Sequence, residues 1–237
     1  MWIVLPTYEE AHSVATVIGG LRAALGSDAR ILVVDDASPD GTGELAERLG
    51  ATVLHRARRR GLGPALQAGF AFALGAGADV VVQLDADGSH DPAVLPALLA
   101  ALDAGAGVAV GSRYVTGGAI AHWPPWRRAL SRAGCAYARG VLRVPVRDLT
   151  SGMKAWRAPA LAATRFAEVH GRGYAFQVEL TYRALLAGVP VTEVPITFTE
   201  RRAGASKLSG AITLEAAWRV PALRLQSRRV LADLSRR

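Results

Sequence analysis

Carboxylates able to hold a cation stand together at one point of the chain. Asp85 and Asp87 follow directly after an apolar run that ends at Leu84, and Ala86 lies between them. Two like charges at the end of a buried strand repel each other and lose hydration, so a bound cation is expected there. Such oxygen ligands suit Mg²⁺ or Mn²⁺, which proteins usually bind through one or two carboxylates plus substrate phosphates. For these residues alone, an equal alternative is that one Asp caps the next helix and the other faces solvent.

A second acidic group follows another apolar run. Asp35 and Asp36 end the run, and Asp40, Gly41 and Thr42 come shortly after them. Asp40 and Thr42 are typical helix caps and Gly41 is a typical turn residue, which favours a structural role for these three. Asp36 is harder to explain in this way and stays a candidate site residue.

The elements that position these carboxylates alternate along the first half of the chain. Short β-branched runs predict strands and Ala/Leu-rich stretches predict helices, which is the rhythm of βαβ units. This rhythm implies an α/β fold with a mostly parallel central sheet and helices on both faces. The expected strands lie near residues 3–5, 31–35, 52–54, 80–84 and 108–111, and the expected helices near residues 9–25, 42–49, 64–76 and 92–104. Ligands of open α/β sheets bind beyond the carboxyl ends of the strands, so the polar residues after strands one, two and four are expected to converge at one edge.

The pattern changes after residue 111. Residues 117–125 contain Gly and Pro pairs typical of a mobile loop, helices are expected at 126–142 and 176–186, and a strand at 191–198. We expect one catalytic domain at residues 1–210 and a basic amphipathic helix at residues 211–237.

Charge and composition narrow the class of protein. The 237 residues carry a formal net charge of +8, and residues 201–237 hold nine Arg or Lys against two acids, which favours a phosphate-bearing partner. The single cysteine, Cys135, allows no intrachain disulfide, and the N-terminus lacks a signal-peptide pattern. No apolar stretch is suited to crossing a bilayer. A cytoplasmic location without a transmembrane segment is therefore expected.

Other common enzyme machinery is missing from the sequence. There is no Gly-x-Gly-x-x-Gly after the first strand, no P-loop pattern and no Gly-x-Ser-x-Gly elbow. This argues against a dinucleotide oxidoreductase and a P-loop NTPase. A basic, non-catalytic nucleic-acid-binding protein fits the charge, but it leaves the acids at the strand ends unexplained and no nucleic-acid-binding signature is present.

Eight short segments, spread in order from Trp2 to about Lys207, form a pattern more specific than any one of them. They are PTYEE at 6–10, VDDASPDGT at 34–42, DADGSH at 85–90, GSRY at 111–114, Arg127 with Ser131, DLTSG at 148–152, FQVE at 176–179 and ERRAGASK at 200–207. Together they resemble the dolichol- and polyprenol-phosphate mannose synthases of glycosyltransferase family two. One Asp-x-Asp is weak evidence, whereas eight ordered matches are strong.

The resemblance implies a Rossmann-like GT-A fold and an inverting transfer of one mannose from GDP-mannose to a polyprenyl (dolichyl-type) monophosphate. The alternatives are UDP-glucose or another nucleotide-sugar donor on the same lipid, and a non-lipid acceptor. Each such nucleotide presents a diphosphate, and only motifs after residue 111 favour mannose. The expected partners are GDP-mannose, polyprenyl phosphate and the cytoplasmic face of a membrane, where the protein is peripheral. A membrane-protein partner is a further candidate, and no nucleic acid is expected.

The resemblance also assigns roles position by position. The residues similar to the family's nucleoside contacts are Pro6, Tyr8, Glu10, Val34 and Asp36. Those similar to its diphosphate and metal contacts are Asp85, Ala86 and Asp87, with Asp87 and Ser89 as the expected ligands of Mg²⁺ or Mn²⁺. Those similar to its phosphate-binding residues are Arg113, Arg201 and Lys207, together with Arg127 and Ser131 as a clamp for the acceptor phosphate. Guanidinium and hydroxyl groups suit tetrahedral oxyanions of this kind.

A few residues depart from the family pattern or fit no site. Ser89 offers a neutral hydroxyl, which is a weaker metal ligand than a carboxylate. Cys135 stands where relatives commonly have Asn, and we interpret it as a small buried hydrophobe rather than a nucleophile. The histidines His90, His122 and His170 fit no ligand spacing and are assigned no metal role.

The end of the chain forms an amphipathic pattern. In residues 222–237 the side chains of Leu223, Val230, Leu231 and Leu234 share one helical face, while the arginines lie mainly elsewhere. We expect this helix to lie on an anionic membrane. An equal alternative is that it packs on the domain or against a partner protein.

Overall fold

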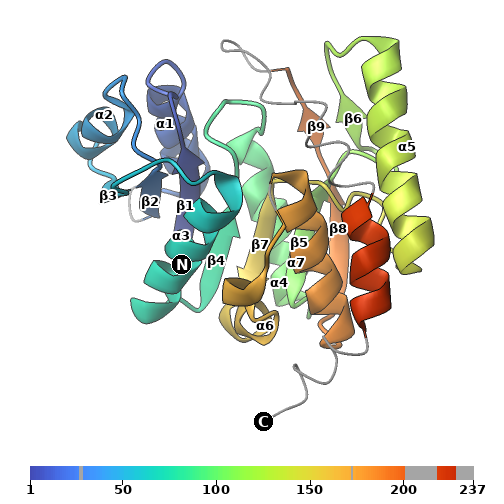
Figure 1. Ribbon diagram of the computed structural model, residues 1–237. Helices are drawn as coiled ribbons and strands as arrows, with labels where there is room; N and C mark the ends of the chain where they lie inside the picture. The colour runs from blue at the N-terminus through green and yellow to red at the C-terminus, as the bar shows by residue number, and fades with distance from the viewer. Residues whose placement is uncertain (27–28, 172, 201–217, 228–237) are drawn as a thin grey trace.

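A seven-stranded sheet forms the centre of the molecule (Figure 1), and its strand order is β3-β2-β1-β4-β7-β5-β8. The computed structural model describes residues 1–26, 29–171, 173–200 and 218–227. The strands of this sheet are β1 (Trp2–Thr7), β2 (Arg30–Asp35), β3 (Thr52–His55), β4 (Val80–Gln83), β5 (Val108–Ser112), β7 (Lys154–Arg157) and β8 (Val191–Pro195). Every pairing is parallel except those of β7, which runs antiparallel to β4 and β5. The expected mostly parallel sheet is confirmed.

Helices cover both faces of the sheet because successive side chains of each strand point to opposite sides. Ile3 and Leu5 of β1 pack on one face, and Trp2 and Val4 pack on the other. The helices on the first face are α1 (Val14–Leu25), α2 (Thr42–Arg48) and α4 (Leu95–Asp103). Those on the second face are α3 (Leu62–Gly75), α6 (Ala158–Ala163) and α7 (Tyr174–Leu186). Short 3-10 turns at Pro92–Val94 and Phe166–Glu168 precede α4 and α7.

The approach of α3 to the sheet depends on Gly69. A Cβ added there would lie 2.4 Å from Cγ1 of Val4 and 3.0 Å from Cγ2 of Val34. Any larger residue would push the helix away from β1 and β2. The same contact fixes Val34 inside the core, where its side chain is fully buried.

The chain after β1 turns before its helix begins, so the expectation of a helix from residue 9 was wrong at that end. Glu9 has a left-handed φ of 55°, which interrupts helical geometry. The main-chain N–H of Glu10 donates to Oγ1 of Thr42 at 3.0 Å, so this turn is tied to the start of α2. Asp40 accepts from the main-chain N–H groups of Thr42 and Ala11, both at 3.1 Å, which confirms its structural role.

The second half of the chain contains elements that the sequence pattern did not predict. A short parallel pair joins β6 (Ala119–Ile120), inside the expected loop, to β9 (Thr197–Phe198). The strand expected at residues 191–198 is therefore two strands, β8 and β9, which separate at Ile196 because each pairs with a different partner.

A long helix, α5 (Pro125–Leu142), lies at the right-hand side of the molecule in Figure 1. Residues 218–227 form a further helix beside it, and Val220 and Leu223 pack in one cluster with Leu142 and Tyr182. The described part of the tail therefore packs on the domain, which was one of the two alternatives. Val230, Leu231 and Leu234 lie outside the described residues.

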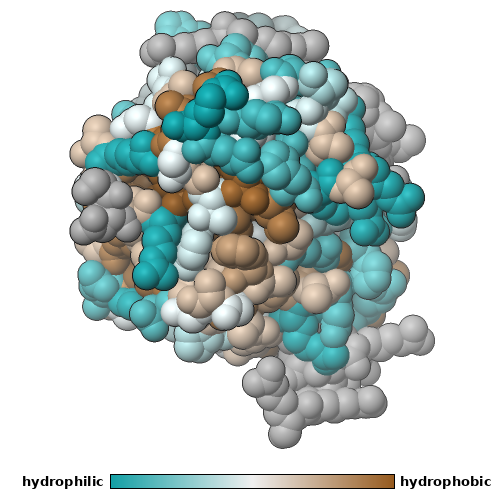
Figure 2. All heavy atoms as spheres, turned by 90° about the vertical axis from the view of Figure 1, so that its left-hand side faces the viewer, coloured by the Kyte–Doolittle hydropathy of each residue, from teal (hydrophilic) through white to brown (hydrophobic). Residues whose placement is uncertain are grey.

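Exposed large apolar side chains gather at α5 and the tail helix. Figure 2 shows the side of the molecule that faces away from α5, where hydrophilic residues surround a hydrophobic area. Among the described residues, Trp126, Leu130 and Tyr137 of α5 and Trp218 and Leu225 of the tail helix are exposed. None of the described helices combines the length and the apolar character needed to cross a bilayer.

Candidate active site

Side-chain hydrogen bonds join the loops that follow β1, β2 and β4. Ser13 Oγ lies 2.7 Å from the carbonyl oxygen of Ala86 and 3.1 Å from Oε2 of Glu10. The main-chain N–H of Glu9 donates to Ser38 Oγ at 3.0 Å. The expected convergence of these strand ends at one edge of the sheet is confirmed.

The carboxylate of Asp36 organises the side of the edge near β2. It is buried and accepts three hydrogen bonds, from Nη1 of Arg56 at 2.7 Å and from the main-chain N–H groups of Arg60 at 2.8 Å and Gly61 at 2.6 Å. Asp36 therefore fixes the loop that enters α3. A contact between Asp36 and a nucleoside stays a prediction.

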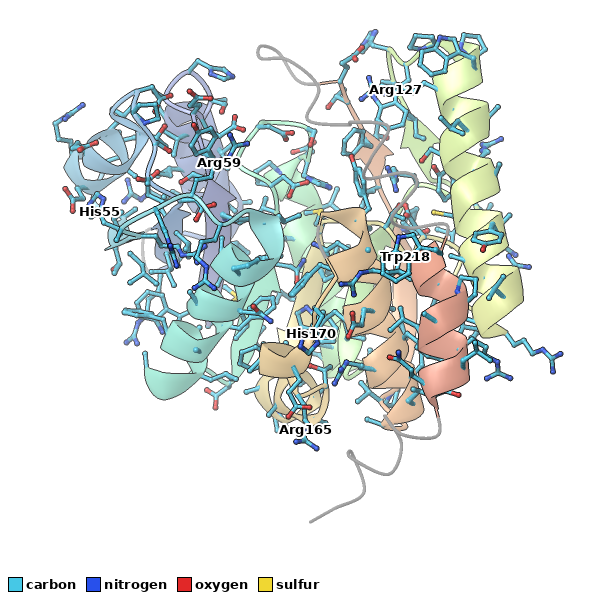
Figure 3. All side chains as sticks on the ribbon, viewed as in Figure 1. His55, Arg59, Arg127, Arg165, His170 and Trp218 are labelled. Atoms are coloured by element: carbon cyan, nitrogen blue, oxygen red, sulfur yellow. The ribbon has the colours of Figure 1, made fainter. Side chains whose placement is uncertain are left out.

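The other predicted nucleoside contacts lie close to Asp36. Tyr8 is covered by the guanidinium of Arg59, 3.8 Å from the centre of its ring (Figure 3). Pro6 pairs with Val34 across β1 and β2. Because the side chain of Val34 is fully buried, the prediction for this residue can concern only its main chain.

The turn after β4 carries the acidic candidates. Asp87 is buried and accepts from the main-chain N–H of Ser89 at 3.0 Å and from Ser89 Oγ at 2.6 Å. Asp85 is about one-third exposed and lies against Gly152, where an added Cβ would be 2.6 Å from its Oδ2. The structure thus brings a buried carboxylate–hydroxyl pair and a more open carboxylate to one turn.

These oxygen atoms fit a small divalent cation. Carboxylate and hydroxyl oxygens are the hard ligands that Mg²⁺ and Mn²⁺ prefer. Within residues 1–26, 29–171, 173–200 and 218–227, no group of three or more His, Cys, Asp or Glu could hold a metal by itself. The oxygens of Asp85, Asp87 and Ser89 fit a cation that completes its coordination with substrate phosphates.

His90 follows this turn but is arranged as a buried neutral ring. Burial lowers the pKa of His90 more than the nearby charges of Asp85 and Asp87 raise it. The ring packs edge-on against Phe198, with the ring centres 5.2 Å apart. Its position fits a packing role beneath the acidic turn.

Arg113, directly after β5, belongs to a buried ion pair. Its Nε and Nη2 each lie 2.7 Å from an oxygen of Asp148, and Nη2 also donates to Thr150 Oγ1 at 2.7 Å. Burial lowers the pKa of Arg113, but the hydrogen bonds and charge of Asp148 outweigh it and raise that pKa. Burial likewise raises the pKa of Asp148, and Arg113 reverses the shift to a net lowering. Both groups are therefore charged at neutral pH, and a phosphate contact by Arg113 stays a prediction.

Cys135 lies beside this ion pair. Its sulfur is buried, 3.3 Å from Thr150 Oγ1. Burial and the charge of Asp148 raise the pKa of the Cys135 thiol. A protonated, buried thiol fits the expected small hydrophobe and not a nucleophile.

The predicted acceptor clamp lies on α5. The hydroxyl of Tyr114 donates to Ser131 Oγ at 2.6 Å. Arg127 donates from Nη1 to Glu200 at 2.6 Å and lies 4.0 Å from the centre of the Trp123 ring. Arg127 and Arg59 both lie in the upper half of the view in Figure 3, Arg127 on the right and Arg59 on the left. The other two basic candidates, Arg201 and Lys207, lie outside the described residues.

Phe198 connects the acidic turn to the basic residues. Its ring lies 5.2 Å from that of His90, 5.4 Å from that of Trp123 and 5.4 Å from the guanidinium of Arg113. The main-chain N–H of Thr199 donates to the carbonyl of Ser89 at 3.1 Å. Acidic and basic candidates are therefore parts of one connected site.

Sequence reasoning missed a buried amide and amine network behind Asp85. Lys154 is fully buried and donates from Nζ to Gln177 Oε1 at 2.6 Å. Gln83 donates from Nε2 to Gln177 Oε1 at 3.0 Å and lies 3.1 Å from the carbonyl of Gly152. Burial lowers the pKa of Lys154 to about 7, although Asp148 and Asp85 raise it. The network supports the Gly152 main chain, which packs against Asp85.

The chain matches a known family of enzymes over more than half of its length. The model of Glycosyl transferase family 2 matches residues 2–163. The chain belongs to glycosyltransferase family 2. It is therefore an enzyme that transfers a sugar, and the nucleic-acid-binding alternative, which only the charge favoured, is set aside.

Relatives of this family 2 glycosyltransferase cover most of the chain. The polyprenol monophosphomannose synthase of Mycolicibacterium smegmatis is 46% identical over 225 residues, which are 92% of this chain and 84% of that protein. The undecaprenyl-phosphate mannosyltransferase of Micrococcus luteus is 45% identical over 218 residues, 90% of this chain and 89% of that protein. The dolichol-phosphate mannosyltransferase of Pyrococcus furiosus is 34% identical, over 90% of this chain and 60% of that protein.

Solved structures share the fold of the family 2 enzyme. Glucosyl-3-phosphoglycerate synthase from Mycobacterium tuberculosis, in complex with Mn²⁺, UDP and glucosyl-3-phosphoglycerate, superimposes with a TM-score of 0.67. The match covers 96% of this chain and 78% of the synthase at 22% identity. The expected GT-A type of fold is confirmed.

Proposed function

We propose that this family 2 glycosyltransferase moves mannose from GDP-mannose to a polyprenyl monophosphate with inversion at the anomeric carbon. The observation that carries the proposal is that Phe198, Thr199 and Trp123 connect the acidic turn after β4 to the basic residues of β5 and α5. Relatives at 46% and 45% identity are named for mannose transfer to polyprenol or undecaprenyl phosphate, which supports both the sugar and the acceptor.

The residues after β1 and β2 hold the nucleoside in this proposal. Glu10 and Asp36 are buried carboxylates, and such groups accept hydrogen bonds from ribose hydroxyls or base N–H groups. Asp85 and the main chain at Ala86 contact the diphosphate. Asp87 and Ser89 hold Mg²⁺ or Mn²⁺, which supplies positive charge that stabilises the leaving diphosphate.

The acceptor phosphate binds between Arg127 and Ser131. A phosphate monoester has a second pKa of about 6, so at neutral pH it is largely a dianion and needs no strong general base. One of its oxygens attacks the anomeric carbon as the bond from that carbon to the diphosphate breaks. GDP leaves, and the sugar is inverted. Positioning, together with the positive charge of the cation and of the arginines beside the leaving diphosphate, would supply most of the rate acceleration.

The role of Asp87 is tested by Asp87→Ala, with Asp103→Ala as the control because Asp103 is an exposed acid at the end of α4. Transfer of radiolabelled mannose to polyprenyl phosphate should fall at least about 1,000-fold in kcat/KM for Asp87→Ala, which corresponds to about 4 kcal/mol. The control should transfer normally. Full activity of Asp87→Ala, with circular dichroism unchanged, would remove the metal role.

The choice of donor is tested separately. Isothermal titration with GDP and with UDP in the presence of Mn²⁺ should give tighter binding of GDP. Tighter binding of UDP would favour the alternative, a UDP-glucose-dependent enzyme acting on the same lipid.

We place the enzyme at the cytoplasmic face of a membrane as a peripheral protein, because a polyprenyl phosphate is held in the bilayer by its long apolar chain. A membrane-protein partner could reinforce this attachment.

A further inference from the structure

A basic cavity lies on α5, next to the predicted acceptor clamp but separate from it. It has a volume of about 220 Å³ and is lined by Tyr114, Arg132, Cys135, Ala136, Arg139 and Arg147. Drug-sized ligands usually occupy about 300–1,000 Å³, so this cavity suits a group of a few heavy atoms. It is too small for a nucleotide.

The three arginines of the cavity contrast with those arginines of the protein that pair with an acid. Arg113, Arg127 and Arg157 each pair with a carboxylate at 2.6 or 2.7 Å. For Arg132, Arg139 and Arg147, no ion pair with an Asp or Glu is found in the part of the chain that the structure describes. Their charge is therefore available to an anionic ligand.

The segment that lines the cavity holds no acid of its own, and the carboxylates that lie beside it are those of Asp148 and Glu193. Residues 114–147 contain six arginines and no Asp or Glu. The charge of Asp148 is neutralised by Arg113. The carboxylate of Glu193 accepts hydrogen bonds from the main-chain N–H groups of Arg147 at 2.8 Å and Asp148 at 2.9 Å. A surface of this kind attracts anions over several ångströms.

The geometry of α5 indicates which anion. Arg132 and Arg139 are seven residues apart, so they lie on one side of the helix about 10 Å from each other. At about 100° per residue of helix, the exposed side chains of Trp126 and Leu130 lie at one border of the solvent-facing surface of α5, and the two arginines lie at the opposite border. A helix with arginines along one side and Trp and Leu along the other suits the interface of an anionic bilayer.

We propose that this cavity binds the phosphate headgroup of an anionic membrane phospholipid, a lipid other than the polyprenyl phosphate acceptor. Guanidinium groups of Arg132, Arg139 and Arg147 form forked hydrogen bonds with the phosphate oxygens. Tyr114 separates this lipid from the acceptor, because it lines the cavity and its hydroxyl donates to Ser131. Headgroup binding thereby holds the acceptor clamp at the membrane surface. The inference that this phosphate belongs to a membrane lipid rests on the proposed function.

The test measures partition of the full chain onto vesicles of phosphatidylglycerol and phosphatidylcholine, compared with phosphatidylcholine alone. Wild-type protein should bind the anionic vesicles, and Arg132→Gln with Arg139→Gln should lower the partition coefficient at least about tenfold. The matched control is Arg30→Gln with Arg48→Gln, which removes the same charge from exposed residues on the β2 and α2 side. It should change the coefficient less than about threefold.

A second variant separates forked recognition from bulk charge. Arg132→Lys with Arg139→Lys keeps the charge but loses the forked geometry, and it should still lose a substantial part of the binding. Equal losses in the cavity variant and the control, or full binding by the lysine variant, would overturn the proposal. Titration with inorganic phosphate that depends on Arg132 and Arg139, without binding to anionic vesicles, would also overturn the lipid as the source.

The outcome is independent of the sugar chemistry. Mannose transfer by the wild-type protein is assayed alongside, with the acceptor in detergent. Vesicle binding through the cavity without any mannose transfer would reject the proposed function and leave this inference standing. Mannose transfer without headgroup-dependent binding to vesicles would reject this inference and leave the proposed function standing.

Discussion

The buried ion pair between Arg113 and Asp148 makes a sharp prediction about stability. The two side chains are 5% and 0% exposed, and Asp148 accepts from Nε, Nη2 and the main-chain N–H of Arg113 at 2.7, 2.7 and 3.0 Å. Asp148→Asn keeps the volume of the side chain but leaves the guanidinium buried without its counter-charge. Removing one partner of a buried pair costs about 3–5 kcal/mol. For a protein of this size that loss corresponds to a fall in Tm of about 6–20 °C.

An exposed pair of the same type provides the control. Arg157 and Asp103 meet at the same distance, 2.7 Å, but their side chains are 39% and 78% exposed. Solvent screens such a pair, so Asp103→Asn should cost less than about 1 kcal/mol. Urea denaturation and calorimetry at pH 7 measure both variants. Equal losses in the two would refute the reasoning that burial of the charge sets the cost.

The same pair predicts how this difference depends on pH. Because the folded protein lowers the pKa of Asp148, its carboxylate adds stability above the unfolded pKa, which is about 3.9. That stability is lost as the pH falls through the lower, folded pKa. The gap between the wild type and Asp148→Asn should therefore be constant from pH 7 to about 5 and shrink well below pH 4.

Two further substitutions test the surroundings of Asp85. Gly152→Ala would place a Cβ 2.6 Å from Asp85 Oδ2, so the carboxylate must move; we expect a loss of about 1–3 kcal/mol and a higher KM for the donor. Gly19→Ala, where an added Cβ meets nothing within 4 Å, is the control and should keep the donor KM unchanged. Lys154→Met removes a buried amine whose pKa is lowered to about 7, so the unfolded chain binds more protons than the folded one between pH 7 and about 10.4. Wild-type stability should rise across that window, so the free energy of unfolding of the wild type should rise relative to that of Lys154→Met in urea denaturation at pH 6.5, 8 and 9.5; a difference independent of pH would refute this.

The parallel half of the fold was predictable because its signals are local. Runs such as those of β1 and β2 are apolar and β-branched, and the helices between them are rich in Ala and Leu. Strand β7 gave no such signal, since its sequence is Lys-Ala-Trp-Arg. It forms a strand because it pairs with β4 on one side and β5 on the other, and because Lys154 donates a hydrogen bond to Gln177 in the core. Partners of that kind are distant in sequence and leave no periodic pattern.

The candidate site also has a part that the sequence predicts and a part that it does not. The acids after β1, β2 and β4 could be placed at one edge from topology alone, because parallel strands end on the same side. The residues that hydrogen-bond to the predicted phosphate-binding residues could not be placed in this way. Asp148 lies 35 residues from Arg113, and Tyr114 lies 17 residues from Ser131. Only the folded chain shows that two predicted phosphate-binding residues are already engaged by an acid and a phenol.

The short segment after β8 explains how the two halves of the site are held in register. Thr199 donates to the carbonyl of Ser89 in the acidic turn, and the next residue, Glu200, accepts from Arg127 in the predicted acceptor clamp. Phe198, immediately before them, packs against His90 on one side and Trp123 on the other. Three consecutive residues therefore span from the turn proposed to hold the cation to the helix proposed to hold the acceptor. In the proposed inverting transfer the attacking oxygen and the leaving diphosphate lie on opposite sides of one carbon, so the spacing fixed by this segment is a condition of that reaction, and not only of the fold.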